Sequence, residues 1–239
     1  MRPLTLVLAG LASTMPLMAQ ETDKAASSFP GLKTLNVDGN DSPHATKISY
    51  DPALAEVINK PLNAAGAANN AEPEVTRLLV AKLDREGQAK YTIDFDPGPS
   101  ADPSFIISNE KSGERIGSIG ADALTVPGNG FIYSTGRTNN LHVERQKFAI
   151  RDGKLEEIKQ PFSYVGLHTK SNVPLTLTAG KGTGEVIAKL DKDSQLTVVL
   201  RDGEHLLIKT PFGLVGWWKM KTDVMAENAE IEGIYYAGD

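Results

Sequence analysis

The densest group of polar side chains that could bind a ligand lies between residues 133 and 142. It contains Tyr133, Arg137, Asn139, Asn140 and His142, with the two asparagines in an expected turn. A guanidinium group binds carboxylates through paired hydrogen bonds, and amide and imidazole groups beside an aromatic ring suit a sugar. We therefore take these five as candidate ligand-binding residues. The alternative is that they are turn formers and surface charges.

Two further sets of acidic residues have spacings seen in functional sites. Asp94 and Asp96 alternate along an expected strand, so both carboxylates lie on one face, as in acid–base pairs. A solvated strand end explains them equally well. Asp84 and Glu86 fit the first and third positions of a calcium loop, but Ala89 replaces the glycine of its sharp turn. We therefore predict no metal site.

The motifs of common enzyme classes are missing from the sequence. A nucleophile needs a base within reach, but the four histidines form neither a Gly-x-Ser-x-Gly nor a His-Glu-x-x-His pattern. The absence of cysteine excludes thiol nucleophiles, disulfides and Cys-ligated zinc. A net charge of −5 offers no basic field for nucleic acid. We expect a binding protein without a cofactor rather than an enzyme.

The N-terminal residues 1–19 have the pattern of a secretory signal peptide. One cation, Arg2, precedes an apolar run over residues 4–12, and Ala19 is a small residue at the expected cleavage point. The run is too short to span a bilayer. We predict a periplasmic or secreted bacterial protein that is not inserted in a membrane after cleavage. Residues 20–46, rich in Ser, Asp, Asn, Gly and Pro, are expected to form a flexible linker.

Residues 47–166 are expected to form a β-rich α+β domain. A short helix is predicted over 51–60, with Asp51 as its N-cap and Pro52 at its first position. The rest of the domain alternates as strands do. A hairpin is expected over 75–96, two short strands around 111–113, and further strands before and after the turn at Asn139 and Asn140.

A short sequence motif occurs twice in the second half of the chain, and we call it the repeated phrase. Residues 151–170 and 201–220 agree at nine of twenty ungapped positions. In each copy an apolar strand meets Asp-Gly, a strong hairpin signal, and a return strand is followed by Pro-Phe and a third strand. Each copy is therefore predicted to be a β-meander. Duplication of this segment explains the agreement. The pattern of strand and turn residues that β-meanders have in common explains it as well.

Residues 171–221 resemble a bacterial SH3 domain. The order of short strands and tight turns fits that family, and Pro-Phe-Gly-Leu-Val-Gly-Trp-Trp at 211–218 is similar to its closing motif. The resemblance implies a small SH3-like β-barrel over 167–222 that recognises cell-wall peptide or glycan. One departure is that residues 205–208 lack the aromatic that the family often has in that region. An acidic tail over 223–239 is expected to add a terminal strand.

Trp217 and Trp218 must point to opposite faces if they lie on one strand. The resemblance implies that Trp217 enters the core and that Trp218 is partly exposed, beside the glycine-rich loop at 180–184. Trp218 is therefore the sixth candidate ligand-binding residue. The alternative is that Trp218 covers a sheet edge or packs on the N-terminal domain.

These observations predict a mainly β, exported and non-catalytic binding or scaffold protein, with peptidoglycan or an envelope protein as its partner. One alternative is a cell-wall enzyme that uses Asp94, Asp96 or His142 and carries the barrel as a targeting module. A third possibility is a structural protein in which the barrel only packs on its neighbour.

Overall fold

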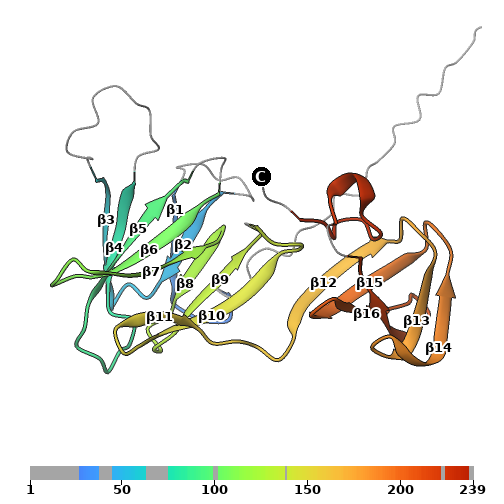
Figure 1. The fold of residues 1–239 in the computed structure, drawn as a ribbon. Coiled ribbons are helices and arrows are strands. Elements are labelled where there is room, and N and C mark those ends of the chain that lie inside the picture. Colours follow the sequence, from blue (N-terminus) through green and yellow to red (C-terminus); the bar gives the residue numbers. More distant parts are fainter. Residues whose placement is uncertain are drawn as a thin grey trace, which may run out of the picture.

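The computed structural model describes residues 27–37, 45–62, 75–98, 102–137, 139–221 and 224–236. These residues form three β-sheets in two lobes that lie side by side (Figure 1). The predicted leader and about half of the predicted linker fall outside the described ranges, and the described part of the linker contains a strand, β1 (Lys33–Asn36), instead of an irregular segment. Within those ranges, no helical segment has the length and apolar character that a bilayer span requires.

Two sheets make up the first lobe. One has the strand order β1-β2-β8-β9-β10-β11, in which β2 and β8 are parallel and the other neighbours antiparallel. The other is an antiparallel meander from β3 to β7. The strands of the first sheet are β1 (Lys33–Asn36), β2 (Lys47–Tyr50), β8 (Ala123–Val126), β9 (Ile132–Gly136), β10 (Glu144–Arg151) and β11 (Lys154–Glu157). Those of the second are β3 (Ala55–Pro61), β4 (Thr76–Ala81), β5 (Tyr91–Asp96), β6 (Ser104–Asn109) and β7 (Arg115–Gly120).

The two sheets of the first lobe enclose a single apolar core. Ile93 and Phe95 of β5 point inward, as the alternation of their strand predicts, and pack with Ile48 and Leu124 of the other sheet. At one corner the sheets approach closely, because a Cβ on Gly117 of β7 would lie 2.8 Å from Cβ of Leu155 on β11. The predicted hairpin over 75–96 is present as β4 and β5, and the strands around 111–113 as β6 and β7.

The predicted helix over 51–60 is wrong, and with it the α+β class of the first lobe. Residues 52–54 form a turn, in which Oδ1 of Asp51 accepts a hydrogen bond from the Ala53 N–H at 2.9 Å. The chain then continues as β3, which pairs with β4. The β-branched Val57 and Ile58 favour an extended backbone, and pairing with β4 gives that backbone the hydrogen bonds that a helix would have made internally.

The second lobe is one antiparallel sheet of order β12-β15-β16-β17-β13-β14. Its strands are β12 (Ser163–Lys170), β13 (Leu175–Gly180), β14 (Thr183–Leu190), β15 (Gln195–Asp202), β16 (His205–Lys209) and β17 (Val215–Lys219). Its two edge strands, β12 and β14, do not pair with each other, so the described residues form no closed barrel. The expectation of a barrel is corrected to an open sheet with its own core.

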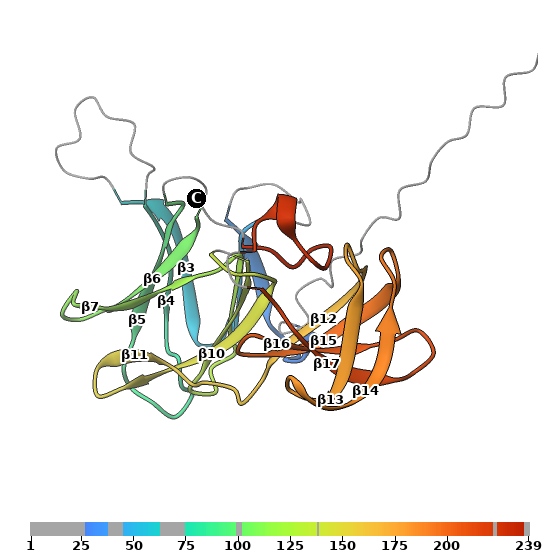
Figure 2. The same ribbon diagram turned by 45° about the vertical axis from the view of Figure 1, so that its right-hand side comes forward.

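The tail completes this second core without a strand. Ile231 and Ile234 are buried in it, and the tail contains a 3₁₀ turn over Ala226–Asn228 and one isolated bridge between Ser171 and Ile231. The expected terminal strand is therefore absent from residues 224–236. In both views of the ribbon the red tail lies above β12 and reaches toward the first lobe (Figures 1 and 2).

The two copies of the repeated phrase have different structures. The second copy is the predicted meander β15-β16-β17. In the first copy, β10 and β11 form a hairpin of the first lobe, but β12 crosses over and pairs with β15 of the second lobe. The turns also differ. In the first copy, Asp152 and Gly153 form the two-residue turn, and both have positive φ, as a type I′ turn requires. In the second copy, Asp202 is already paired with His205, so the two-residue loop starts at Gly203 instead of at the equivalent aspartate.

Candidate functional site

The five candidate residues at 133–142 do not form one site. Tyr133 lies on β9, with its ring centroid 5.3 Å from that of Phe29 and 6.4 Å from that of Phe131. Its hydroxyl accepts a hydrogen bond from Nδ2 of Asn129 at 3.2 Å. The other four follow β9, in the turn that leads to β10. Tyr133 is therefore part of a separate aromatic group.

Arg137 fixes the β9–β10 turn to the tail. Its Nη2 donates to the Tyr235 carbonyl at 3.0 Å, and its guanidinium lies 4.2 Å from the centroid of the Tyr235 ring. Its backbone N–H donates to Oδ2 of Asp122 at 3.1 Å. The Nε atom of Arg137 is buried and makes no hydrogen bond to the described residues. Part of the guanidinium thus remains available to a ligand.

Asn139 and Asn140 form the turn itself. Asn139 has φ of 55°, a left-handed conformation that asparagine tolerates, and Oδ1 accepts a hydrogen bond from the Tyr236 hydroxyl at 3.1 Å. The N–H of Asn140 donates to the Arg137 carbonyl at 3.1 Å. Both residues therefore have the structural role that the alternative interpretation gave them.

His142 is a buried imidazole beneath this turn, with 2% of its surface exposed. Nδ1 donates to the Val143 carbonyl at 3.0 Å, and Nε2 has no hydrogen-bond partner among the described residues. The nearest carboxylate oxygen, Oε1 of Glu144, is 3.9 Å from Nε2. Burial, followed by the positive charges of Arg201, Arg137 and Arg145, lowers the pKa of His142 to about 4.

The structure adds Arg201 and Glu144, which sequence reasoning did not bring to this place, and it positions Arg145, which belongs to the same polar region of the sequence. Nη1 of Arg201, on β15, lies 3.7 Å from Oε1 of Glu144 on β10, and its Nε donates to the Gly203 carbonyl at 2.8 Å. The guanidinium of Arg145 lies 5.4 Å from the centroid of the Tyr164 ring on β12. Burial raises the pKa of Glu144, and Arg201 opposes that shift. The cluster is therefore a junction between the two lobes.

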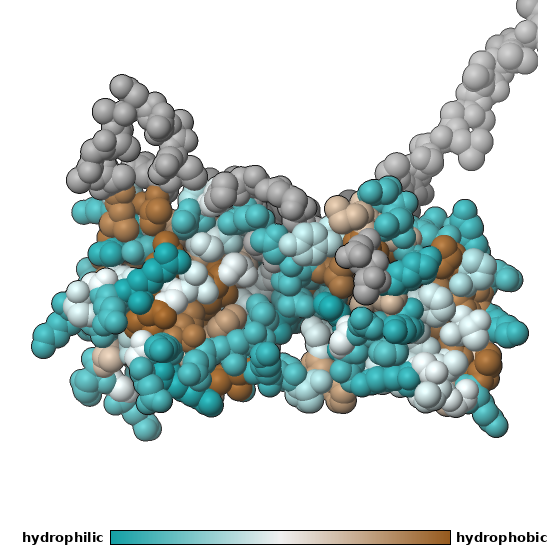
Figure 3. All heavy atoms as spheres, viewed as in Figure 1, coloured by the Kyte–Doolittle hydropathy of each residue, from teal (hydrophilic) through white to brown (hydrophobic). Residues whose placement is uncertain are grey.

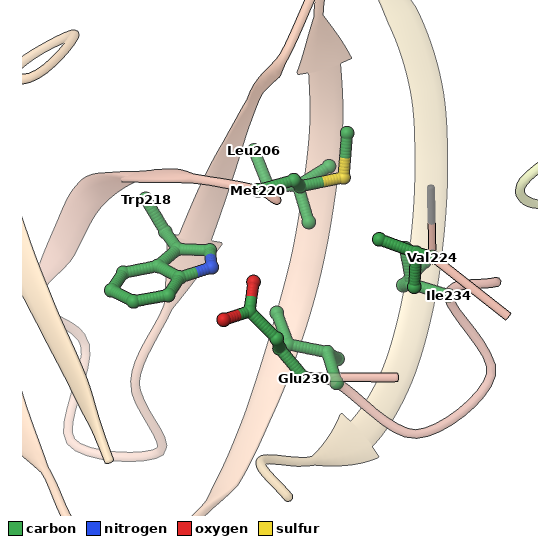
Figure 4. Close-up of a pocket in the computed structure, with 7 residues that line it drawn as sticks. Leu206, Trp218, Met220, Val224, Glu230 and Ile234 are labelled. Carbon is green, nitrogen blue, oxygen red and sulfur yellow. The ribbon is translucent and has the colours of Figure 1, made fainter. Parts of the chain in front are cut away.

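The two tryptophans have the opposite orientation to the one expected. Trp218 pairs with the fully buried Leu206 and packs against the second core, with its Nε1 buried and unpartnered among the described residues. It lines a small cavity together with Met220, Glu230 and the tail. In Figure 4 its indole nitrogen is on the side that faces the Glu230 carboxylate. The carboxylate accepts a hydrogen bond from the Lys221 N–H at 3.1 Å.

Trp217 is on the outer face of the sheet, beside the 180–184 loop. The Nζ of Lys181 lies 5.1 Å from the centroid of the Trp217 ring and also ion-pairs with Asp202. Opposed residues of paired strands share a face, and Thr178 pairs with both Trp217 and Val186. Val215, two residues before Trp217, lies on the same face. We use the name outer apolar band for the group made up of Val186, Val215 and Trp217 on this face and of the exposed Phe212 and Leu214 in the turn before β17.

The acidic candidates are engaged in structural contacts. Asp94 is 5% exposed, and its carboxylate accepts two hydrogen bonds from Arg77, at 2.9 and 3.1 Å. Oδ1 of Asp96 accepts a hydrogen bond from the Gly98 N–H, and Oδ1 of Asp84 accepts one from the Glu86 N–H. In the described part of the chain, no three histidine or acidic side chains come together as metal ligands would.

Comparison of the chain with protein-family models, with curated proteins and with solved structures finds no match. The function must therefore be argued from the geometry of the junction and of the outer face.

Proposed function

We propose that this is an exported, non-catalytic binding protein whose second lobe recognises cell-wall peptide or glycan through the outer apolar band. The observation that carries the proposal is the exposure of the band. Phe212 is 67% exposed, Val186 52%, Leu214 46% and Val215 44%. Exposed apolar surface of this kind is typical of interaction sites.

The polar neighbours of Trp217 support a sugar or peptide as the ligand. An indole face offers a flat apolar surface, and polar groups around it give orientation to what it binds. Lys181, at the ring of Trp217, and its partner Asp202 supply such groups. The resemblance of residues 171–221 to bacterial SH3 domains and the signal-like pattern of residues 1–19 agree with a ligand in the cell envelope.

Cosedimentation of the exported protein with purified peptidoglycan tests this proposal. We expect Trp217→Ala and Phe212→Ala to lower the bound fraction at least several-fold, because both remove apolar contact area from the band. Phe162→Ala is the matched control, since Phe162 is 51% exposed but is not part of the band. Equal binding by the Trp217→Ala protein and the unmodified chain would contradict the proposal.

The enzyme alternative receives no comparable support. Asp94 is paired to Arg77, the Asp96 carboxylate accepts a hydrogen bond from the Gly98 N–H, and His142 lies in the junction. The junction favours the scaffold form of the proposal, in which the first lobe and the tail hold the binding lobe in a fixed orientation.

A further inference from the structure

We propose that the junction between the two lobes is a binding site for an oxyanion, either a carboxylate or a phosphate group, held by Arg137 and Arg201 beside His142. This site is separate from the outer apolar band and does not rest on the function proposed for it. The bound anion would contact both lobes, because Arg137 and His142 belong to the first and Arg201 to the second.

The first argument is the unused hydrogen-bonding capacity of buried groups. Nε of Arg137 and Nε2 of His142 are both buried without a partner among the described residues. A buried polar atom without a hydrogen bond is energetically costly, so such atoms usually have a ligand or water to satisfy them. Arg137 offers a donor directly. In the neutral imidazole Nδ1 donates to Val143, so Nε2 of His142 is an acceptor and becomes a donor to the anion only if the ring takes up a proton.

The second argument is the convergence of positive charge. Arg137 lies in the same turn as His142, and Arg201 reaches Glu144, whose carboxylate is also the one nearest to His142. The positive charges of both arginines, with that of Arg145, lower the pKa of His142. Glu144 faces the same place, but it is 3.7 Å from Arg201 and 3.9 Å from His142. Charge-assisted hydrogen bonds are about 2.7–2.9 Å long, so Glu144 fills neither partner's bonding position. An oxyanion bound here would fill that position of Arg201 and accept a hydrogen bond from Nε of Arg137.

The third argument is the shape of the junction. Figure 3 shows a gap between the two lobes, in the part of the view where β10 faces β12 in Figure 1. Hydrophilic surface borders the gap on its upper and left sides. The Arg201–Glu144 pair and the Arg145–Tyr164 contact connect β10 with β15 and β12. The gap is open to solvent between the two lobes (Figure 3).

Calorimetric titration of the full chain tests the site with inorganic phosphate and with glutarate, each against chloride at matched ionic strength. We expect saturable binding of at least one oxyanion and none of chloride. Tighter binding of phosphate would identify a phosphate ligand, and tighter binding of glutarate would identify a carboxylate ligand. No difference between the oxyanions and chloride would overturn the proposal.

Single substitutions then test where the anion binds. We expect Arg201→Gln to weaken binding about tenfold or more, as the loss of a charge-assisted hydrogen bond predicts, and Arg201→Lys to weaken it less. The matched control is Arg151→Gln, which removes the same charge from the exposed end of β10. Equal losses in Arg201→Gln and Arg151→Gln, or no loss in either, would overturn the site. The thermal shift of the unmodified protein with phosphate gives a second measurement that needs no variant.

Discussion

At the scale of single residues, the protonation of His142 connects the junction to stability. The imidazole has an ordinary pKa of 6.5 in the unfolded chain and about 4 in the folded protein. The unfolded state therefore takes up the proton first as the pH falls. The contribution of His142 is complete above pH 6.5 and is lost progressively toward pH 4. The loss amounts to at most about 3 kcal/mol.

Urea unfolding at about pH 7 and about pH 4.5 measures this loss. We expect His142→Gln to remove part of the pH dependence, whatever it does to stability at neutral pH. His168→Gln is the control, because the exposed His168 bonds Thr197 outside the junction. The prediction would be contradicted if the free energy of unfolding of His142→Gln fell between the two pH values as much as that of the unmodified protein. Glu144 acts in the opposite sense, because burial raises its pKa and so favours the folded state at low pH.

At the scale of elements, equivalent glycines of the repeated phrase are required for different reasons. Gly166 of β12 has φ of +66°, and a Cβ there would lie 2.6 Å or less from atoms of the Tyr164 side chain. Gly216 of β17 has no positive φ, but its Cβ would lie 2.8 Å from Cβ of Leu177 and 3.3 Å from that of Ile187. The close approach of β17 to β13 and β14 thus depends on the missing side chain.

We expect Gly216→Ala to lower the free energy of unfolding by about 2 kcal/mol, a typical cost of overpacking. The inserted methyl group would force β13 and β14 away from β17. Thermal or urea unfolding gives the value. Gly87→Ala serves as the control, because its φ is not positive and its nearest contact is the Asp84 Cβ at 3.3 Å. Equal stability of the Gly216→Ala protein and the parent would show that the sheet relaxes freely.

Edge strands of both lobes carry irregularities that hinder pairing with other chains. The ladders of β3, β12 and β14 each contain a register shift. Such bulges twist an edge and interrupt the row of backbone groups that another strand would bind. Binding through the face of the second sheet, rather than through its edges, is consistent with this arrangement.

At the scale of the whole molecule, the tail connects the second core to the first lobe. Ile231 and Ile234 are each 2% exposed in the second core. The N–H of the adjacent Tyr235 donates to the Leu141 carbonyl of the first lobe at 3.2 Å. The tail thus stabilises the second lobe and holds it against its neighbour.

We expect Ile231→Ala to destabilise the second lobe by about 3 kcal/mol, through lost burial and the cavity that remains. Hydrogen exchange should show the loss in β12 to β17, with β4 to β6 still protected. Met225→Ala is the control, because Met225 is in the same tail but 41% exposed. Uniform loss of protection in both lobes would show that they unfold as one cooperative unit.

The sequence by itself determined several hairpins, but not β1 and β3, which it predicted to be linker and helix. Alternating patterns predicted the β4–β5 and β6–β7 hairpins, and Asp152-Gly153 predicted its turn, because these signals are local. Three features were decided only by the tertiary structure. The strand β12 pairs with β15 of the second copy and not with the hairpin of its own copy, Trp218 faces inward, and Arg201 lies beside Glu144. Each of these depends on pairing between distant segments. A one-residue change in the register between two strands moves every side chain of a strand to the other face of the sheet. Local periodicity carries no information about that register.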